Sequence, residues 1–140
     1  LNSSNYNNFD SYFTLYAGSF ITPVHIYDEN KDAKKAERNK WRTESKNLVI
    51  KTFGYEYYAK YHLSGFVLDH ILSLKEGQEI LSKNTTKLTK KMLVGLGNLQ
   101  WLPASENSSK NSFSWQTTEE LIENHQLGIN NLNLRYTLEE

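Results

Sequence analysis

The residues best suited to chemistry fall in two stretches near the middle of the chain, FVLDHI and NLQWLPASENSSKN. The first contains Asp69 and His70, and the second contains Asn98, Asn107 and Lys110. Histidine titrates near neutral pH, so it suits the removal of a proton from water. A carboxylate with amide oxygens makes a hard, sparsely charged site that Mg²⁺ accepts. A base beside a cation is what the hydrolysis of a phosphodiester requires.

Spacing decides which of these side chains can meet. Asp69 and His70 are neighbours, so they serve one site only at a strand end or a bulge. Asn107 and Asn111 are four residues apart and share one face of a helix, with Lys110 three residues beyond Asn107. A strand, a second strand and a helix would then each deliver a polar side chain to one place.

The order of three short motifs resembles the HNH endonuclease family, also called the ββα-metal or His-Me finger class. The motifs are DHI at residues 69–71, NLQ at 98–100 and NSSK at 107–110, and the step from Asn98 to Asn107 matches the family spacing. The residues of these motifs are most similar to those of the phage and intron-encoded homing branch, and the resemblance covers residues 48–115.

The chain departs from the family pattern in two ways. Many members pin the finger with cysteine pairs, which are absent here, so we expect the stabilising role to fall on Tyr55, Tyr57, Phe66 and Trp101. The 28 residues from His70 to Asn98 exceed the usual gap by about a helix.

The resemblance implies a role for each matching residue. His70 would be the general base, Asp69 and Asn107 the metal ligands, and Asn98 the residue that holds His70 and its loop. Asn111 is a weaker candidate for a further ligand. The implied cofactor is one Mg²⁺, which Mn²⁺ could replace, without structural zinc. The implied substrate is DNA, with 5′-phosphate and 3′-hydroxyl products, and a homodimer would serve if both strands are cut.

Two alternatives from other classes stay open. Each motif taken alone has an ordinary structural reading, since an Asp-His pair is common in turns and an Asn in a capped helix usually faces solvent. The chain is then either a nucleic-acid-binding module that keeps the finger without catalysis, or an interaction domain with an accidental match. The presence of both a base and metal ligands favours the enzyme.

The net charge of zero conceals an uneven distribution. Residues 31–111 hold 15 Lys and Arg against 8 Asp and Glu, while the flanks hold 1 against 8. A basic centre is expected where a chain meets a polyanion, although a solvated helix face is the other reading. The expected nucleic-acid contacts are six basic residues: Arg42, Lys83, Lys87, Lys90, Lys91 and Lys110.

The composition predicts a soluble globular protein. Hydrophobic residues make up 38% of the 140 residues, no 18-residue apolar run is present, and cysteine is absent. We expect one domain over 1–140 with a nuclease core at 48–115 and a loosely docked lead at 1–10. The absence of cysteine suits the cytoplasm, and a secreted toxin is the alternative.

The expected fold class is α+β, a ββα-metal finger with flanking helices and terminal strands. Two strands are expected within 12–27, then a helix through 34–53 that Asn30 or Asp32 caps and Gly54 ends. Its expected buried stripe is Ala33, Ala36, Trp41 and Leu48.

The rest of the chain is expected to contain the finger and a closing strand. Residues 55–61 and 66–71 alternate like a hairpin, and 73–97 resembles an insertion with a short helix after Thr85 or Thr86. A strand at 98–102 should pair with 66–70 under a helix that begins near Pro103. A helix capped by Thr117 or Thr118 and a strand over 132–138 should follow.

Overall fold

The computed structural model describes residues 29–138, and the expected strands within 12–27 and lead at 1–10 lie outside that range. Residues 33–140 form one compact unit, and the site described below lies within it. Within 29–138 no helix is both long and apolar enough to cross a bilayer.

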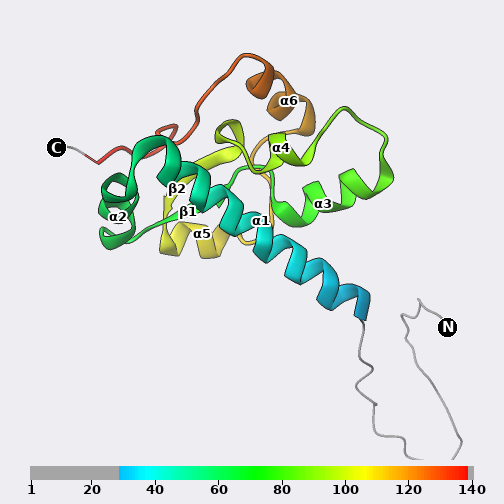
Figure 1. Cartoon of the computed structure of the whole chain (residues 1–140), viewed down its shortest axis with the longest axis horizontal. Coiled ribbons are helices and arrows are strands. Elements are labelled where there is room, and N and C mark those ends of the chain that lie inside the picture. Colours follow the sequence, from blue (N-terminus) through cyan, green and yellow to red (C-terminus); the bar gives the residue numbers. More distant parts are fainter. Residues whose placement is uncertain (1–28, 139–140) are drawn as a thin grey trace, which may run out of the picture. The chain divides into compact units, whose positions relative to one another are not determined.

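Two helices precede the strands (Figure 1). Helix α1, Glu29–Phe53, confirms the helix expected at 34–53, but it begins before Asn30 and Asp32, so neither caps it. Gly54 ends α1 as expected, with a positive φ of 98° that favours glycine. Helix α2, Tyr55–Leu63, replaces the strand expected at 55–61, and that expectation was wrong.

The stripe that α1 buries differs from the expected one. Trp41 is buried and Leu48 is half-buried, but Ala33 and Ala36 are exposed. The fully buried positions of the stripe continue from Trp41 through Ser45 and Val49 at four-residue steps, so the polar Ser45 lies in the interior.

Strands β1, Phe66–His70, and β2, Leu99–Pro103, form an antiparallel pair. Phe66 lies opposite Pro103, and Asp69 lies opposite Gln100. Helix α5, Ala104–Lys110, begins directly after β2 and contacts both strands. The chain is therefore mixed α and β, with the order strand, strand, helix where the motifs predicted it.

Four further elements surround the pair. Helix α3, Leu74–Lys83, and helix α4, Lys90–Leu93, occupy the expected insertion, and Thr89 caps α4 in place of Thr85 or Thr86. A 3-10 turn, η1, covers Leu96–Asn98 and leads into β2.

Helix α6, Thr118–Gln126, begins with a capping box, in which the side chains of Thr117 and Glu120 each accept a hydrogen bond from the other residue's backbone N–H. Thr117 is one of the two caps that the sequence predicted. The strand expected over 132–138 is not present, so the closing-strand prediction was wrong. Leu132 is instead buried in an irregular segment beside the buried Asn131, and its carbonyl accepts a hydrogen bond from the Trp101 amide at 3.4 Å.

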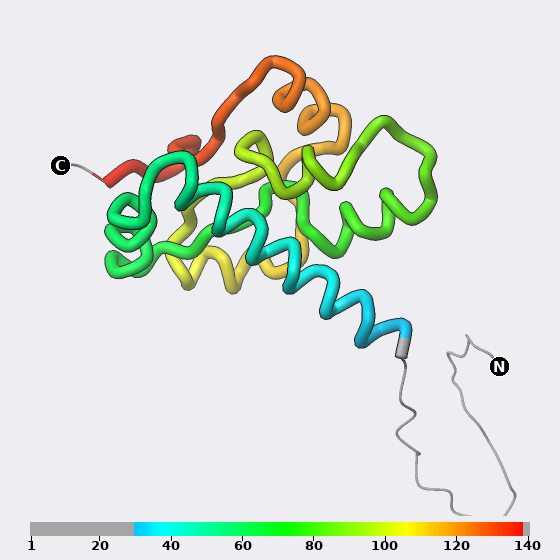
Figure 2. Tube along the Cα trace, viewed as in Figure 1, coloured from blue at the N-terminus to red at the C-terminus, as the bar shows by residue number. Residues whose placement is uncertain are grey.

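Two hydrophobic clusters hold these elements together. Figure 2 traces the path of the chain through the elements. The first joins α1 to α3, α4 and α6 through Trp41, Leu72, Leu74, Leu88, Leu93 and Leu121. The second joins α1, α2 and β2 through Val49, Tyr61, Leu99, Trp101 and Leu132. Of the four residues expected to stabilise the finger, Trp101 is fully buried, Tyr57 and Phe66 pack on its cluster, and Tyr55 is exposed.

Candidate functional site

Asp69 is buried in a network that fixes both carboxylate oxygens. Its cross-strand partner Gln100 donates from Nε2 to Oδ2 at 2.9 Å, and Lys110 Nζ lies 3.2 Å from each oxygen. Arg135 donates to Gln100 Oε1 at 3.1 Å, which leaves the amide nitrogen of Gln100 to face Asp69. Burial raises the pKa of the Asp69 carboxyl, and the Gln100 hydrogen bond and the charge of Lys110 offset part of that rise.

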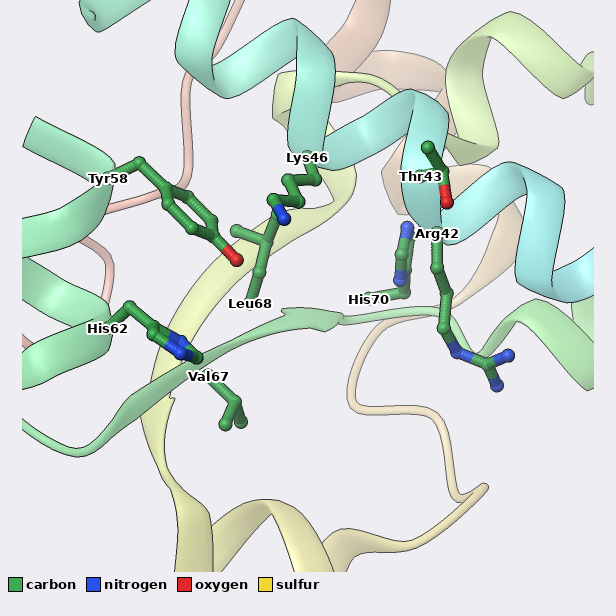
Figure 3. Close-up of a pocket in the computed structure, with 8 residues that line it drawn as sticks. All are labelled: Arg42, Thr43, Lys46, Tyr58, His62, Val67, Leu68 and His70. Carbon is green, nitrogen blue, oxygen red and sulfur yellow. The ribbon is translucent and has the colours of Figure 1, made fainter. Parts of the chain in front are cut away.

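His70 ends β1 with its ring directed toward α1 (Figure 3). Its Nε2 lies 2.8 Å from Ser45 Oγ, and the Ser45 hydroxyl donates to the Val94 carbonyl at 2.9 Å. A serine has one hydroxyl proton, so the Nε2–H of His70 must be the donor in the first bond. The neutral ring then has its lone pair on Nδ1, the nitrogen that can accept a proton.

The surroundings of His70 keep its ring neutral. Burial and the positive charges of Arg42 and Lys110 lower the pKa of His70 to about 3. The Nδ1 atom has no hydrogen-bond partner among residues 29–138, and it is not one of their fully enclosed unpaired atoms. His70 is therefore unprotonated near neutral pH, but the burial and the charges that keep it so also make it a weak base. A bound phosphate beside the ring would have to offset them before His70 could take a proton from water.

Asn98 joins the end of β1 to the turn before β2. It is fully buried, donates from Nδ2 to the carbonyls of Leu72 at 3.0 Å and Leu93 at 2.8 Å, and accepts at Oδ1 from the Leu72 amide at 2.7 Å. These hydrogen bonds hold the loop that follows His70, but none of them reaches the His70 ring, whose partner is Ser45. Gln116 adds a fourth, to Oδ1 at 2.8 Å.

A cavity of about 190 Å³ brings the other sequence-predicted residues together. Asp69 and His70 line it from the end of β1, and Asn107, Lys110 and Asn111 line it from α5 and its C-terminal end. Asn111 lies just beyond α5 with a left-handed φ of 53°, so it does not continue the helix face of Asn107 as the spacing suggested. Both amide side chains nevertheless line the cavity that contains the carboxylate.

The donor set fits one weakly held, hard cation. Asp69 supplies a carboxylate, and Asn107 and Asn111 could supply amide oxygens, which leaves positions for water and phosphate. Among residues 29–138 no three His, Asp or Glu side chains gather, so such a site would depend on a single charged ligand. The carboxylate already holds one cation, the Lys110 ammonium, and a metal ion would have to share or take that position.

The six basic residues expected to contact nucleic acid fall into three groups. Arg42 lines the cavity beside His70. Lys110 is buried and donates to the His70 carbonyl at 2.8 Å as well as to Asp69. Lys110 therefore cannot reach an external phosphate from this position. Lys83, Lys87, Lys90 and Lys91 are exposed but do not line this cavity, and Lys90 pairs with Glu44 at 2.6 Å.

Ser45 and Gln100 were not predicted as site residues, although both form hydrogen bonds with predicted ones, His70 and Asp69. Gln100 belongs to the NLQ motif, and its place opposite Asp69 follows from the antiparallel register. A signal for Ser45 existed, because it occupies the centre of the buried α1 stripe where an apolar residue is usual.

No protein-family model, curated protein or solved structure matches this chain, so the interpretation of the site depends on its own geometry.

Proposed function

We propose that the chain is a metal-dependent endonuclease of the HNH class, which hydrolyses phosphodiester bonds in DNA. One observation carries the proposal: the end of β1 and the C-terminal end of α5, which packs on the β1–β2 pair, bring a neutral histidine, a buried carboxylate and two amide side chains to the same cavity. Asp69 and His70 lie 37 to 42 positions before Asn107 and Asn111 along the chain, so local sequence does not force the two pairs together.

His70 would perform the proton transfer. Its Nδ1 accepts a proton from water, the water oxygen forms a bond to phosphorus, and the bond from phosphorus to the 3′ oxygen breaks. The leaving oxygen takes a proton from solvent, which gives 5′-phosphate and 3′-hydroxyl ends. A divalent cation held by Asp69 and Asn107 would supply positive charge beside the phosphate as negative charge develops there.

A supercoiled-plasmid assay tests the proposal. Relaxed plasmid should form with Mg²⁺ or Mn²⁺ and not with EDTA, and DNA ligase should reseal the nicks. His70→Ala should lower turnover roughly 10²- to 10⁴-fold, the usual contribution of a general base, while DNA binding is retained. His125→Ala is the matched control, because His125 is half-buried and does not line the cavity.

Two results would count against the enzyme in different ways. Cleavage that continues in excess chelator would remove the metal from the mechanism, and wild-type turnover by His70→Ala would remove the base.

The inactive nucleic-acid-binding module is the second candidate, and the neutralisation of Asp69 by Lys110 favours it. Binding of duplex DNA without nicking in either metal would support that module.

A further inference from the structure

A second cavity adjoins the candidate site and has no part in the chemistry described above. It measures about 270 Å³ and lies between α1, α2 and β1 (Figure 3). Arg42, Leu68 and His70 line both cavities, so a bound chain could extend from one into the other. The side chains special to the second cavity include Lys46 from α1, Tyr58 and His62 from α2, and Val67 from β1.

The charges of this cavity are positive and unpaired. Arg42 and Lys46 are one helical turn apart, and neither forms an ion pair with a carboxylate in the part of the chain that the structure describes. Arg42 donates to the amide oxygen of Asn39 at 2.6 Å, and Lys46 Nζ lies 5.3 Å from the centre of the Tyr58 ring. No acidic residue lines the cavity, so an anion would meet two uncompensated cations there.

The remaining walls mix hydrocarbon with aromatic and uncharged polar side chains, Thr43 and His62 among them. Val67 and Leu68 contribute hydrocarbon, and the Tyr58 ring is held between His62, stacked at 5.8 Å, and Trp101, tilted at 5.8 Å. Cations beside hydrocarbon suit the phosphate and the sugar of a nucleic-acid backbone better than a free inorganic anion.

We propose that this second cavity is a subsite for the sugar-phosphate backbone of the substrate strand, next to the phosphate that reacts at His70. Lys46 contacts the neighbouring phosphate, Arg42 lies between the two phosphates, and the sugar packs on Val67 and Leu68. The inference rests on the proposed function for the position of the reacting phosphate. Contacts of this kind orient the strand without reading its sequence.

The test measures binding without catalysis. Fluorescence anisotropy with a labelled 20-base-pair duplex in EDTA gives Kd as a function of NaCl concentration for the wild type, Lys46→Gln and Arg42→Gln. Each variant should weaken binding equally for two unrelated duplex sequences and lower the slope of log Kd against log salt by about 0.9, the loss of one phosphate contact. Lys51→Gln is the matched control, since Lys51 is exposed on the same helix and lines neither cavity.

Inorganic phosphate at constant ionic strength is the second probe. It should fail to displace the duplex, because it lacks the sugar that fills the apolar wall. Displacement by millimolar phosphate, an unchanged slope for Lys46→Gln, or a wild type that binds no duplex would each overturn the subsite. The nicking assay is scored separately: nicking with an unchanged slope removes only the subsite, whereas salt-dependent binding through Lys46 without nicking removes only the nuclease.

Discussion

At the scale of single residues, Ser45 determines which nitrogen of His70 carries the proton. Its hydroxyl is committed to the Val94 carbonyl, so it can only accept from Nε2–H of His70. The carbonyl comes from the segment between α4 and η1, which means that three separate parts of the chain fix one imidazole ring. We regard Ser45 as a positioning residue, because it acts on the proposed base and has no contact with the reacting atoms.

Ser45→Ala should therefore disturb the tautomer of His70. In the wild type, ¹⁵N NMR should detect the proton on Nε2, and the variant should show a mixture of the two tautomers. Loss of a partner that orients a functional histidine costs roughly 10- to 100-fold in activity, and we expect kcat to fall by that factor with little change in KM.

Thr43→Ala supplies the control for this effect. Thr43 is on the same helix and also donates its hydroxyl to a backbone carbonyl, that of Asn39 at 3.2 Å, but it forms no hydrogen bond with the His70 ring. The control should keep the wild-type tautomer. A single Nε2–H tautomer in Ser45→Ala would show that Ser45 does not set the protonation of His70.

At the scale of elements, the buried pair of Lys110 and Asp69 fastens α5 to β1. Lys110 is 2% exposed, and its three contacts with Asp69 and the His70 carbonyl all reach the end of that strand. The same helix carries Asn107, so the pair also sets the distance between the proposed metal ligands. The ammonium occupies the position on Asp69 where a metal ion would bind.

Lys110→Met should expose this competition. Removal of one partner leaves a buried carboxylate uncompensated, which costs roughly 3–5 kcal/mol of unfolding free energy. Mg²⁺ should recover part of it, by about 1.4 kcal/mol at a concentration ten times Kd, and should raise Tm more in the variant than in the wild type. Calorimetric scans with Mg²⁺ and with EDTA measure both effects.

The double variant Lys110→Met with Asp69→Asn should lose the response to Mg²⁺, because the charged ligand is gone. Lys91→Met, at an exposed position outside both cavities, should behave as the wild type. An equal response to Mg²⁺ with and without Lys110 would mean that the ammonium and the metal ion use different positions.

Elements also differ in how far the sequence could predict them. The strand pair and α6 were predictable, because their signals are local: a short apolar run beside polar residues, and the Thr117 capping box. Helix α2 was not, because its alternating tyrosines resemble a strand. In the fold, Tyr57 and Tyr61 instead use a four-residue step to pack on Trp101, at 6.2 and 4.7 Å between ring centres, so tertiary contacts outweigh the local pattern.

The candidate site shows the same division. Asp69, His70 and Asn107 were predictable as neighbours, since adjacent strands and the helix that follows must bring their ends together. The occupation of Asp69 by Lys110 was not, because a lysine three residues beyond Asn107 usually faces solvent on a short surface helix. Only the packing of α5 against β1 determines that this ammonium is buried.

At the scale of the whole molecule, the site places a neutral histidine among positive charges in the interior. Arg42 and Lys110 both disfavour a second proton on His70, and burial disfavours it further. In the unfolded chain the same histidine titrates near its ordinary pKa of about 6.5. The folded and unfolded states therefore bind different numbers of protons in acidic solution, and the stability of the fold must depend on pH.

The sign of this dependence follows from the lowered pKa. Between pH 6.5 and the folded value of about 3, the unfolded chain carries the extra proton, so acid favours unfolding. The stability contributed by neutral His70 is complete above pH 6.5 and is lost as the pH falls, by up to about 1.4 kcal/mol per pH unit.

Urea unfolding in EDTA at several values between pH 7.5 and 4.5 measures this loss of stability, with His70→Gln as the reference that cannot titrate. The unfolding free energy of the wild type should fall relative to that of His70→Gln by about 2–3 kcal/mol over the range. The raised pKa of Asp69 acts in the opposite direction, because a carboxyl that holds its proton more firmly in the fold gains stability from acid. Since Asp69 is retained in both proteins, its contribution largely cancels in the comparison. Parallel curves of unfolding free energy against pH for the two proteins would show that His70 gains its proton as readily in the fold as in the unfolded chain. A wild type that gains stability in acid relative to His70→Gln would show that Asp69 holds a charged imidazolium beside it.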